Sequence, residues 1–301
     1  MKIHYSKEVA KSLKTKRPVL ALESTIISHG MPHPQNLEFA QLAESICKER
    51  GVTPATIAII GGKVFVGLEK DQINFISKES SVKKVSRREL GIAVSNKWNG
   101  ATTVSATMHL ANLSNIKVFA TGGIGGVHRG AKDTFDISED ISALGSIPMV
   151  VISAGVKAIL DVGLTLEQLE TNGITLVGYK TNEFPVFYSR NSGYYDIHQA
   201  NSAKHIAEIH KNNIDVGIHS ALLVANPIPK KDEIPSEKME KIILGACSIA
   251  AGNNVTGKIL TPYLLAEIFK KTDGRSLDAN RSLALNNVSQ GPRRIRSSTP
   301  E

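Results

Sequence analysis

Short apolar segments alternate with longer amphipathic ones along most of the 301-residue chain, and this alternation limits the folds that it can form. The apolar segments have the length of buried strands, and the amphipathic ones show the period of helices. The predicted strands are residues 18–22, 55–60, 63–66, 116–120, 149–154 and 174–179. Helices are predicted at residues 36–50, 71–78, 90–97, 105–113, 165–173, 203–211, 236–252 and 277–288. Strands that alternate with helices are typical of an α/β protein with a parallel or mixed sheet.

The chain shows no internal repeat, no low-complexity linker and no clear boundary, so a single domain is expected over residues 1–290. Residues 291–301 contain Arg293, Arg294 and Arg296 and are predicted to form a disordered basic tail. No segment has the length or composition of a membrane span or a signal peptide. We therefore expect a cytoplasmic protein that does not bind membranes.

The net charge of +8 suits a phosphorylated substrate or a nucleic acid. Nucleic acid is the weaker interpretation, because the chain has one Trp and no basic stripe interleaved with aromatic residues. If it were correct, binding to bulk RNA would depend on salt. Cys47 and Cys247 are far apart in the sequence, which indicates neither a zinc site nor a disulfide framework.

Residues 121–157 carry most of the groups that could perform chemistry. Four glycines occur within five residues directly after a predicted strand, and Lys157 follows the apolar run of residues 149–154. The glycine run does not fit a dinucleotide-binding motif, because His128 stands where the third glycine is needed. It also misses the phosphate loop of nucleotide hydrolases, since Ala131 separates Gly130 from Lys132. The glycines therefore indicate either tight packing or a ligand cradle.

An acidic cluster follows the glycines and consists of Asp133, Asp136 and Asp140 beside Ser138. Oxygen ligands without cysteine favour Mg²⁺ or Mn²⁺ over zinc. The alternative is a helix N-terminus, where the helix dipole favours negative charge. Both interpretations remain open from the sequence.

Two further residues stand at the ends of apolar strands. A lysine such as Lys157 is costly to bury unless it is neutral or paired, which favours a nucleophilic amine over a surface lysine. Glu23 follows the predicted strand at residues 18–22, where α/β sheets place their ligands, although a helix N-cap or a solvated turn would explain it too. Lys84 lies in a basic cluster at residues 82–88 that is either a solvated loop or a phosphate clamp.

Several long stretches resemble the pseudouridine-5'-phosphate glycosidase family, which is also called indigoidine synthase A-like. The resemblance covers the chain up to about residue 290. The stretches are ALEST (21–25), KVSRRELG (84–91), NGATTVSATM (99–108), KVFATGGIGGVHRGAKDTFDISED (117–140), ISAGVK (152–157) and VANPIP (224–229). The resemblance implies an α/β/α-layered mixed sheet with a sugar-kinase-like outline, and a homotrimer. It also implies a glycosidase or lyase that reversibly converts pseudouridine 5'-phosphate and water into ribose 5-phosphate and uracil.

The resemblance also implies residue roles. Glu23 would be the proton donor, Lys157 the covalent nucleophile, and Asp136 the ligand of one Mn²⁺ ion, or Mg²⁺, per subunit. His128 is expected near the base. The remaining residues expected to bind the phosphorylated nucleoside are Lys84, Thr103, Val104, Ser138, Glu139 and Asp140.

A carbon leaving group explains why a lysine is needed. Ordinary glycosidases expel oxygen or nitrogen, usually with two carboxylates. Carbon leaves less readily, so we expect Glu23 to protonate the ring oxygen and Lys157 to bond C1' of the opened ribose as a Schiff base. A ribokinase-like sugar kinase is the alternative function, but it needs a nucleotide-phosphate loop that neither glycine stretch provides.

Overall fold

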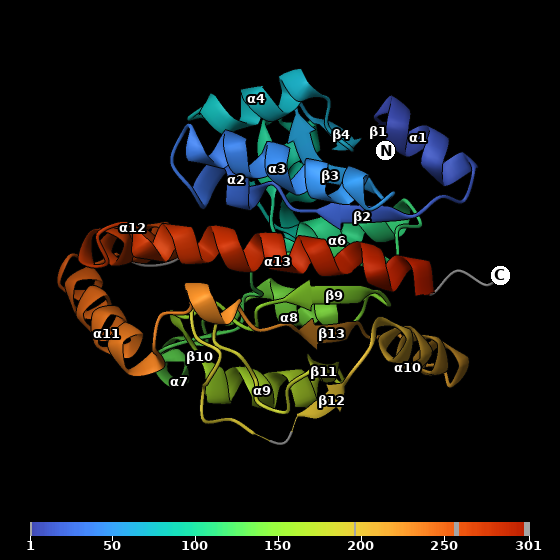
Figure 1. Cartoon of the computed structure of the whole chain (residues 1–301). Helices are drawn as coiled ribbons and strands as arrows, with labels where there is room; N and C mark the ends of the chain where they lie inside the picture. The colour runs from blue at the N-terminus through green and yellow to red at the C-terminus, as the bar shows by residue number, and fades with distance from the viewer. Residues whose placement is uncertain (1, 196, 256–258, 298–301) are drawn as a thin grey trace.

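The computed structural model describes residues 2–195, 197–255 and 259–297, with side chains as far as residue 291. Within these residues, eleven strands form one mixed sheet. Nine of them follow the order β1-β4-β3-β2-β7-β9-β13-β11-β12, β6 pairs with β3, and β5 pairs with β6. Helices cover both faces of this sheet, so the molecule has three layers (Figure 1). Two short strands, β8 and β10, form a separate antiparallel pair.

Most neighbouring strands of the main sheet are parallel, and β3 pairs antiparallel with β4 and with β6. The main strands are β1 (Ile3–Tyr5), β2 (Val19–Leu22), β3 (Thr53–Ile60), β4 (Lys63–Val66), β5 (Lys83–Val85), β6 (Gly100–Thr102), β7 (Val118–Ala120), β9 (Val150–Ser153), β11 (Thr175–Tyr179), β12 (His198–Ala200) and β13 (Leu222–Ala225). The separate pair is β8 (Val127–His128) and β10 (Leu160–Asp161).

The central strands are apolar because both of their faces are covered. Every residue of β2, β7, β9 and β13 is buried. Parallel strands between two helical layers have no solvent face, so their sequences form continuous apolar runs rather than alternating patterns. This burial explains why β2, β7 and β9 could be located from the sequence, whereas β13 lies outside the predicted strands.

The longest helix, α13, crosses one face of the sheet in contact with β2, β7 and β9, between α3 and α10 (Figure 1). In the same view α6 and α8 lie behind the sheet and contact each other. The helices are α1 (Lys7–Lys14), α2 (Thr25–His29), α3 (Gln35–Glu49), α4 (Lys70–Lys78), α5 (Leu90–Ser95), α6 (Val104–Leu113), α7 (Ala131–Thr134), α8 (Glu139–Leu144), α9 (Val162–Thr171), α10 (Ala203–Asp215), α11 (Ser236–Gly252), α12 (Leu260–Lys271) and α13 (Arg275–Ser297), with 3-10 turns η1 (Arg87–Glu89) and η2 (Lys230–Asp232).

The structure confirms the mixed α/β sheet and corrects two local predictions. The basic cluster is not a plain loop, because it forms β5 and η1. The last helix continues to Ser297, so a disordered tail from residue 291 is wrong for residues 291–297, and residues 298–301 lie outside the described part. Both cysteines are free. Among the described residues, no helix combines the length and hydropathy needed to span a bilayer.

Candidate active site

Three neighbouring parallel strands, β2, β7 and β9, end at the same edge of the sheet. Leu22 pairs with Ala120, and Ala120 pairs with Ile152, so the strand ends are level. Glu23 follows β2 directly, and Lys157 follows β9 after a short turn. The carboxyl ends of parallel strands are where open α/β sheets bind their ligands. The structure therefore brings together the two residues predicted to be catalytic.

The carboxyl group of Glu23 lies in an environment that favours its protonated form. Only 7% of the residue is exposed, and the Thr121 hydroxyl donates a hydrogen bond to its Oε1. Burial raises the pKa of Glu23. The charge of Lys157 and the Thr121 hydrogen bond oppose this rise, and Asp140 adds to it. A carboxyl group with a raised pKa is suited to donate a proton near neutral pH.

Gly155 determines how the chain brings Lys157 into the cleft. Its φ of 83° is in the left-handed region, and a Cβ atom there would collide with the carbonyl oxygen of Pro185. The backbone N–H of Lys157 then donates to the carbonyl of Ile124 at 3.1 Å, which joins the turn to the glycine run. The residue is half-buried and lines the same cleft as Glu23.

The cleft has a polar part and an apolar part that meet at Glu23 and Lys157. The polar part has a volume of about 1610 Å³ when counted out to open solvent, and the apolar part about 550 Å³ on the same basis. Residues that line both parts are Glu23, Thr25, Lys84, Lys157 and Thr261. A ligand with two chemically different ends could therefore contact both catalytic candidates at its centre.

The polar part holds several of the predicted ligand-binding residues. Lys84 on β5 and Thr103 at the N-cap of α6 line it, as does His128. Burial lowers the pKa of His128, Asp136 opposes this, and Lys84 and Lys157 add to it. The structure places His128 only in the polar part, away from the apolar part of the cleft. Val104 is 1% exposed and its side chain lies in the core, so its predicted role is limited to its backbone.

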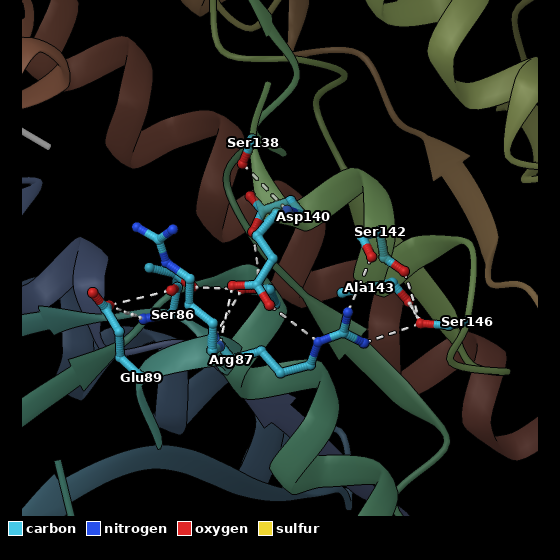
Figure 2. Close-up of polar contacts among 12 residues, drawn as sticks. Ser86, Arg87, Glu89, Ser138, Asp140, Ser142, Ala143 and Ser146 are labelled. Atoms are coloured by element: carbon cyan, nitrogen blue, oxygen red, sulfur yellow. Dashed lines mark hydrogen bonds and ion pairs between the residues drawn. The ribbon is translucent and has the colours of Figure 1, made fainter. Parts of the chain in front are cut away.

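Glu139 and Asp140 hold the wall of the cleft together, and Figure 2 shows the polar contacts around Asp140, Arg87 and Ser138. The two carboxylate oxygens of Asp140 accept backbone N–H bonds from Ser105 at 3.0 Å and from Gly125 at 2.8 Å. Those of Glu139 accept from Nε of Arg87 and from the backbone of Arg88, both at 3.2 Å. These bonds join η1, α6, α8 and the glycine run, while contact of the two acids with substrate stays a prediction.

The remaining member of that segment, Ser138, caps helix α8. Its hydroxyl accepts the backbone N–H of Asp140 at 3.3 Å, and the residue lines the polar part of the cleft. A serine at this position satisfies a free N–H group of the first turn. Ser138 is therefore placed to contact a ligand and to fix the start of α8.

The glycine run has different surroundings at its two ends. Gly122 and Gly123 line the apolar part of the cleft. Gly125 lies so close to Ser138 that an added Cβ would collide with it, and Gly126 packs in the same way against Thr165. The end of the run is therefore a tight packing contact, while a ligand cradle at its start stays a prediction.

Asp136 is the most exposed of the acidic side chains that line the polar part of the cleft. Its side chain is 42% exposed, and its Oδ2 lies 4.0 Å from Nδ1 of His128. No group of three His, Cys, Asp or Glu side chains suited to a metal occurs among the described residues. A hydrated Mg²⁺ or Mn²⁺ ion can be held by one or two carboxylates and several waters. The residues present fit such an ion bound through Asp136, and they do not fit zinc.

The apolar part contains two polar atoms that the sequence did not indicate. Nε2 of His29 and Oδ1 of Asn280 are buried and have no hydrogen-bond partner in the described structure. Both residues line this part of the cleft together with Phe187, Pro262 and Leu265. Unsatisfied buried polar atoms are costly, and a ligand is one explanation for them. These two residues are therefore candidate ligand-binding groups.

A second buried asparagine on α13, Asn287, binds the backbone that directly follows β7. Nδ2 of Asn287 donates to the carbonyls of Thr121 at 2.8 Å and Gly122 at 3.3 Å. Its Oδ1 accepts from Asn226 at 2.8 Å. Asn280 and Asn287 are seven residues apart, which places them on one face of the helix. Two asparagines seven residues apart on one helix face were visible in the sequence, and this pattern could have identified them as candidates for the site.

A layered α/β sheet that presents a lysine and a protonatable carboxyl group at adjacent strand ends has the equipment of a lysine-dependent covalent enzyme. The chain belongs to the family described as Indigoidine synthase A like protein, whose pattern matches residues 8–293. It is 48% identical over 289 residues to the pseudouridine-5'-phosphate glycosidase of Petrotoga mobilis, with 96% of this chain and 94% of that protein covered. The pseudouridine-5'-phosphate glycosidase of Clostridium botulinum is also 48% identical, over 95% of this chain and 94% of its own.

Two solved structures are similar to this one over nearly its whole length. An indigoidine synthase A-like protein from Thermotoga maritima is 34% identical with a TM-score of 0.89, covering 97% of this chain and 95% of its own. The prealnumycin C-glycosynthase AlnA, solved in complex with ribulose 5-phosphate, is 33% identical with a TM-score of 0.91, covering 98% of this chain and 96% of its own.

Proposed function

We propose that the protein reversibly cleaves the carbon–carbon glycosidic bond of pseudouridine 5'-phosphate to give ribose 5-phosphate and uracil. The observation that carries this proposal is the meeting of Glu23 and Lys157 in one cleft between a polar and an apolar part. The relatives' names support the substrate, and the sugar phosphate bound to AlnA supports binding of a pentose 5-phosphate.

The two parts of the cleft suit the two ends of this substrate. The ribose phosphate occupies the polar part, where Lys84 and Thr103 offer a positive charge and a hydroxyl. Uracil occupies the apolar part, where Phe187 offers a ring surface and Asn280 an amide. C1' of the ribose then lies between them, beside Lys157.

The reaction begins with ring opening. The carboxyl group of Glu23 protonates the ring oxygen, and the C1'–oxygen bond breaks. The lone pair of uracil N1 moves into the N1–C6 bond, and the electrons of the C5–C6 double bond form a double bond between C5 and C1'. The neutral amine of Lys157 adds to C1' and restores the C5–C6 double bond. Glu23 ends this step as a carboxylate, which the positive charge now on the Lys157 nitrogen stabilises. That nitrogen then releases one proton to water and regains its lone pair.

Bond cleavage follows from the lysine adduct. A proton is added to C5 of uracil, and the lysine nitrogen lone pair forms an iminium with C1' as the C1'–C5 bond breaks. Uracil leaves with the new C5–H bond. Water then adds to the iminium and releases ribose 5-phosphate, which restores the Lys157 amine. Mn²⁺ or Mg²⁺ held through Asp136 would supply positive charge against the sugar phosphate.

Two assays test the proposal. Release of free uracil from pseudouridine 5'-phosphate in the presence of Mn²⁺ measures the reaction, and Lys157→Ala should abolish it while Lys132→Ala, at an exposed position outside the cleft, should not. Borohydride with ribose 5-phosphate should label the peptide that contains Lys157. Near-native activity of Lys157→Ala, or a label on another peptide, would contradict the mechanism.

The oligomeric state and location are part of the same proposal. The family resemblance implies a homotrimer that acts in the cytoplasm on a free nucleotide. Light scattering of the purified protein tests the trimer by its mass, relative to 32.4 kDa for one chain.

A further inference from the structure

His29 stands at the end of α2 with one ring nitrogen engaged and the other free. Nε2 is buried without a partner in the described structure. The backbone of Val82 acts on the ring as a hydrogen-bond acceptor that raises its pKa, which assigns the ring proton to Nδ1. The residue lines the apolar part of the cleft with Asn280 and Lys157.

This arrangement makes Nε2 a hydrogen-bond acceptor. Neutral imidazole carries one N–H, so a donor at Nδ1 leaves Nε2 with a lone pair. Burial and the nearby charge of Lys84 lower the pKa of His29, while the Val82 hydrogen bond opposes this, which keeps the ring neutral. A buried acceptor without a donor lowers the stability of the folded protein, and a ligand that supplies a donor removes this cost.

A C5-linked uracil offers a donor that an N1-linked uracil does not have. In pseudouridine the sugar is attached to C5, so both ring nitrogens, N1 and N3, carry hydrogen. In uridine N1 carries the sugar and only N3 remains a donor. A second acceptor in the base pocket can therefore distinguish the two linkages by chemistry alone.

We propose that Nε2 of His29 accepts the N1–H of the uracil ring and makes the enzyme specific for C-linked nucleotides. This inference rests on the proposed function and extends it to a residue that recognises the base. Oδ1 of Asn280 accepts a hydrogen bond from the other donor of the uracil ring, N3–H.

The same contact assists the chemistry. During ring opening the lone pair of N1 moves into the ring, and N1 becomes positively charged while it keeps its hydrogen. Protonation at C5 before cleavage places positive charge on N1 again. An acceptor aimed at N1–H binds more strongly when the nitrogen is positive, so His29 stabilises both charged states.

The synthetic direction provides a direct test, with ribose 5-phosphate and three bases: uracil, 1-methyluracil and 3-methyluracil. The wild type should use 1-methyluracil with a kcat/KM lower than that for uracil by on the order of 10²-fold, because the acceptor is left unpaired and the methyl group meets the ring. His29→Ala should lose kcat with uracil and reduce this preference to a few-fold. It should leave discrimination against 3-methyluracil unchanged.

Controls separate recognition from damage to the fold. His29→Gln can present an amide oxygen and should recover part of the preference, and His33→Ala, at an exposed position outside the cleft, should behave as the wild type. Equal use of uracil and 1-methyluracil by the wild type overturns the inference without any variant. An unchanged preference in a folded His29→Ala also overturns it. If the wild type forms no pseudouridine 5'-phosphate from uracil, the proposed function itself fails.

Discussion

The hydroxyl of Thr121 donates a hydrogen bond to the carboxyl group of Glu23 and thereby joins the ends of β7 and β2. The carbonyl of Thr121 is held in turn by Asn287 on α13. Thr121 therefore positions Glu23, the proposed proton donor, and Asn287 positions the backbone of Thr121. This relationship links the C-terminal helix to the chemistry of the cleft.

Removal of this hydroxyl should shift the pH dependence of the reaction. The Thr121 hydrogen bond lowers the pKa of Glu23, although less than burial raises it. Thr121→Val should therefore raise this pKa further and keep Glu23 protonated to higher pH. The alkaline limb of the kcat profile should move to higher pH, and Thr121→Ser, which keeps the hydroxyl, should not move it. An unchanged alkaline limb in Thr121→Val would show that Thr121 does not affect the protonation of Glu23.

Glu23→Gln should inactivate the enzyme and stabilise it at alkaline pH. Because the folded-state pKa is raised, Glu23 favours folding below its unfolded pKa of about 4.5, and this contribution is lost as pH rises through the folded value. The amide is never ionised, so Tm of Glu23→Gln should exceed that of the wild type at pH 8 and match it near pH 4. Activity should fall by about 10²–10⁴-fold. Thermal unfolding at several pH values checks the crossover, with the exposed Glu170→Gln as control.

Gly155→Ala should destabilise the protein far more than Gly193→Ala. Both glycines have a left-handed φ, 83° and 81°. A Cβ at Gly155 would collide with the Pro185 carbonyl, whereas nothing lies within 4 Å of one at Gly193. We expect Gly193→Ala to lower the free energy of unfolding by about 1–2 kcal/mol and Gly155→Ala by more than about 3 kcal/mol. Urea denaturation measures both, and equal losses would show that the contact with Pro185 is easily relieved.

Asp136→Asn should weaken the response to divalent ions without unfolding the protein, because the residue is partly exposed. Loss of its charge should raise the Mn²⁺ concentration needed for half-maximal activity by about 10-fold or more. Binding of Mn²⁺ alone, followed by its electron paramagnetic resonance signal, gives a second readout. Asp133→Asn, on the exposed face of α7, serves as the matched control. Unaltered Mn²⁺ binding by Asp136→Asn would exclude this aspartate as the ligand.

The sequence predicted those parts of the protein that depend on local composition. The central strands are continuous apolar runs because helices cover both of their faces, and Glu23 and Lys157 stand just beyond two of these runs. The positions of both residues at the sheet edge follow from the strand boundaries alone. The carboxyl ends of parallel strands then bring them together.

The rest of the site depends on contacts between segments far apart in the chain. Asp140 bonds to Ser105 and Gly125, and nothing in its own segment distinguishes an acid that holds backbone N–H groups from one that binds a ligand. Asn280 and His29 meet in the cleft from elements near opposite ends of the chain. Their pairing follows from the path of α13 across the sheet, which no local pattern determines.

That path has a consequence for how the protein is made. Asn280 and Asn287 are among the last residues of the domain to leave the ribosome, yet one lines the cleft and the other braces the Thr121 backbone. A nascent chain that already contains Glu23 and Lys157 lacks both until α13 docks. Catalysis should therefore begin only after α13 has been synthesised and has docked on the sheet.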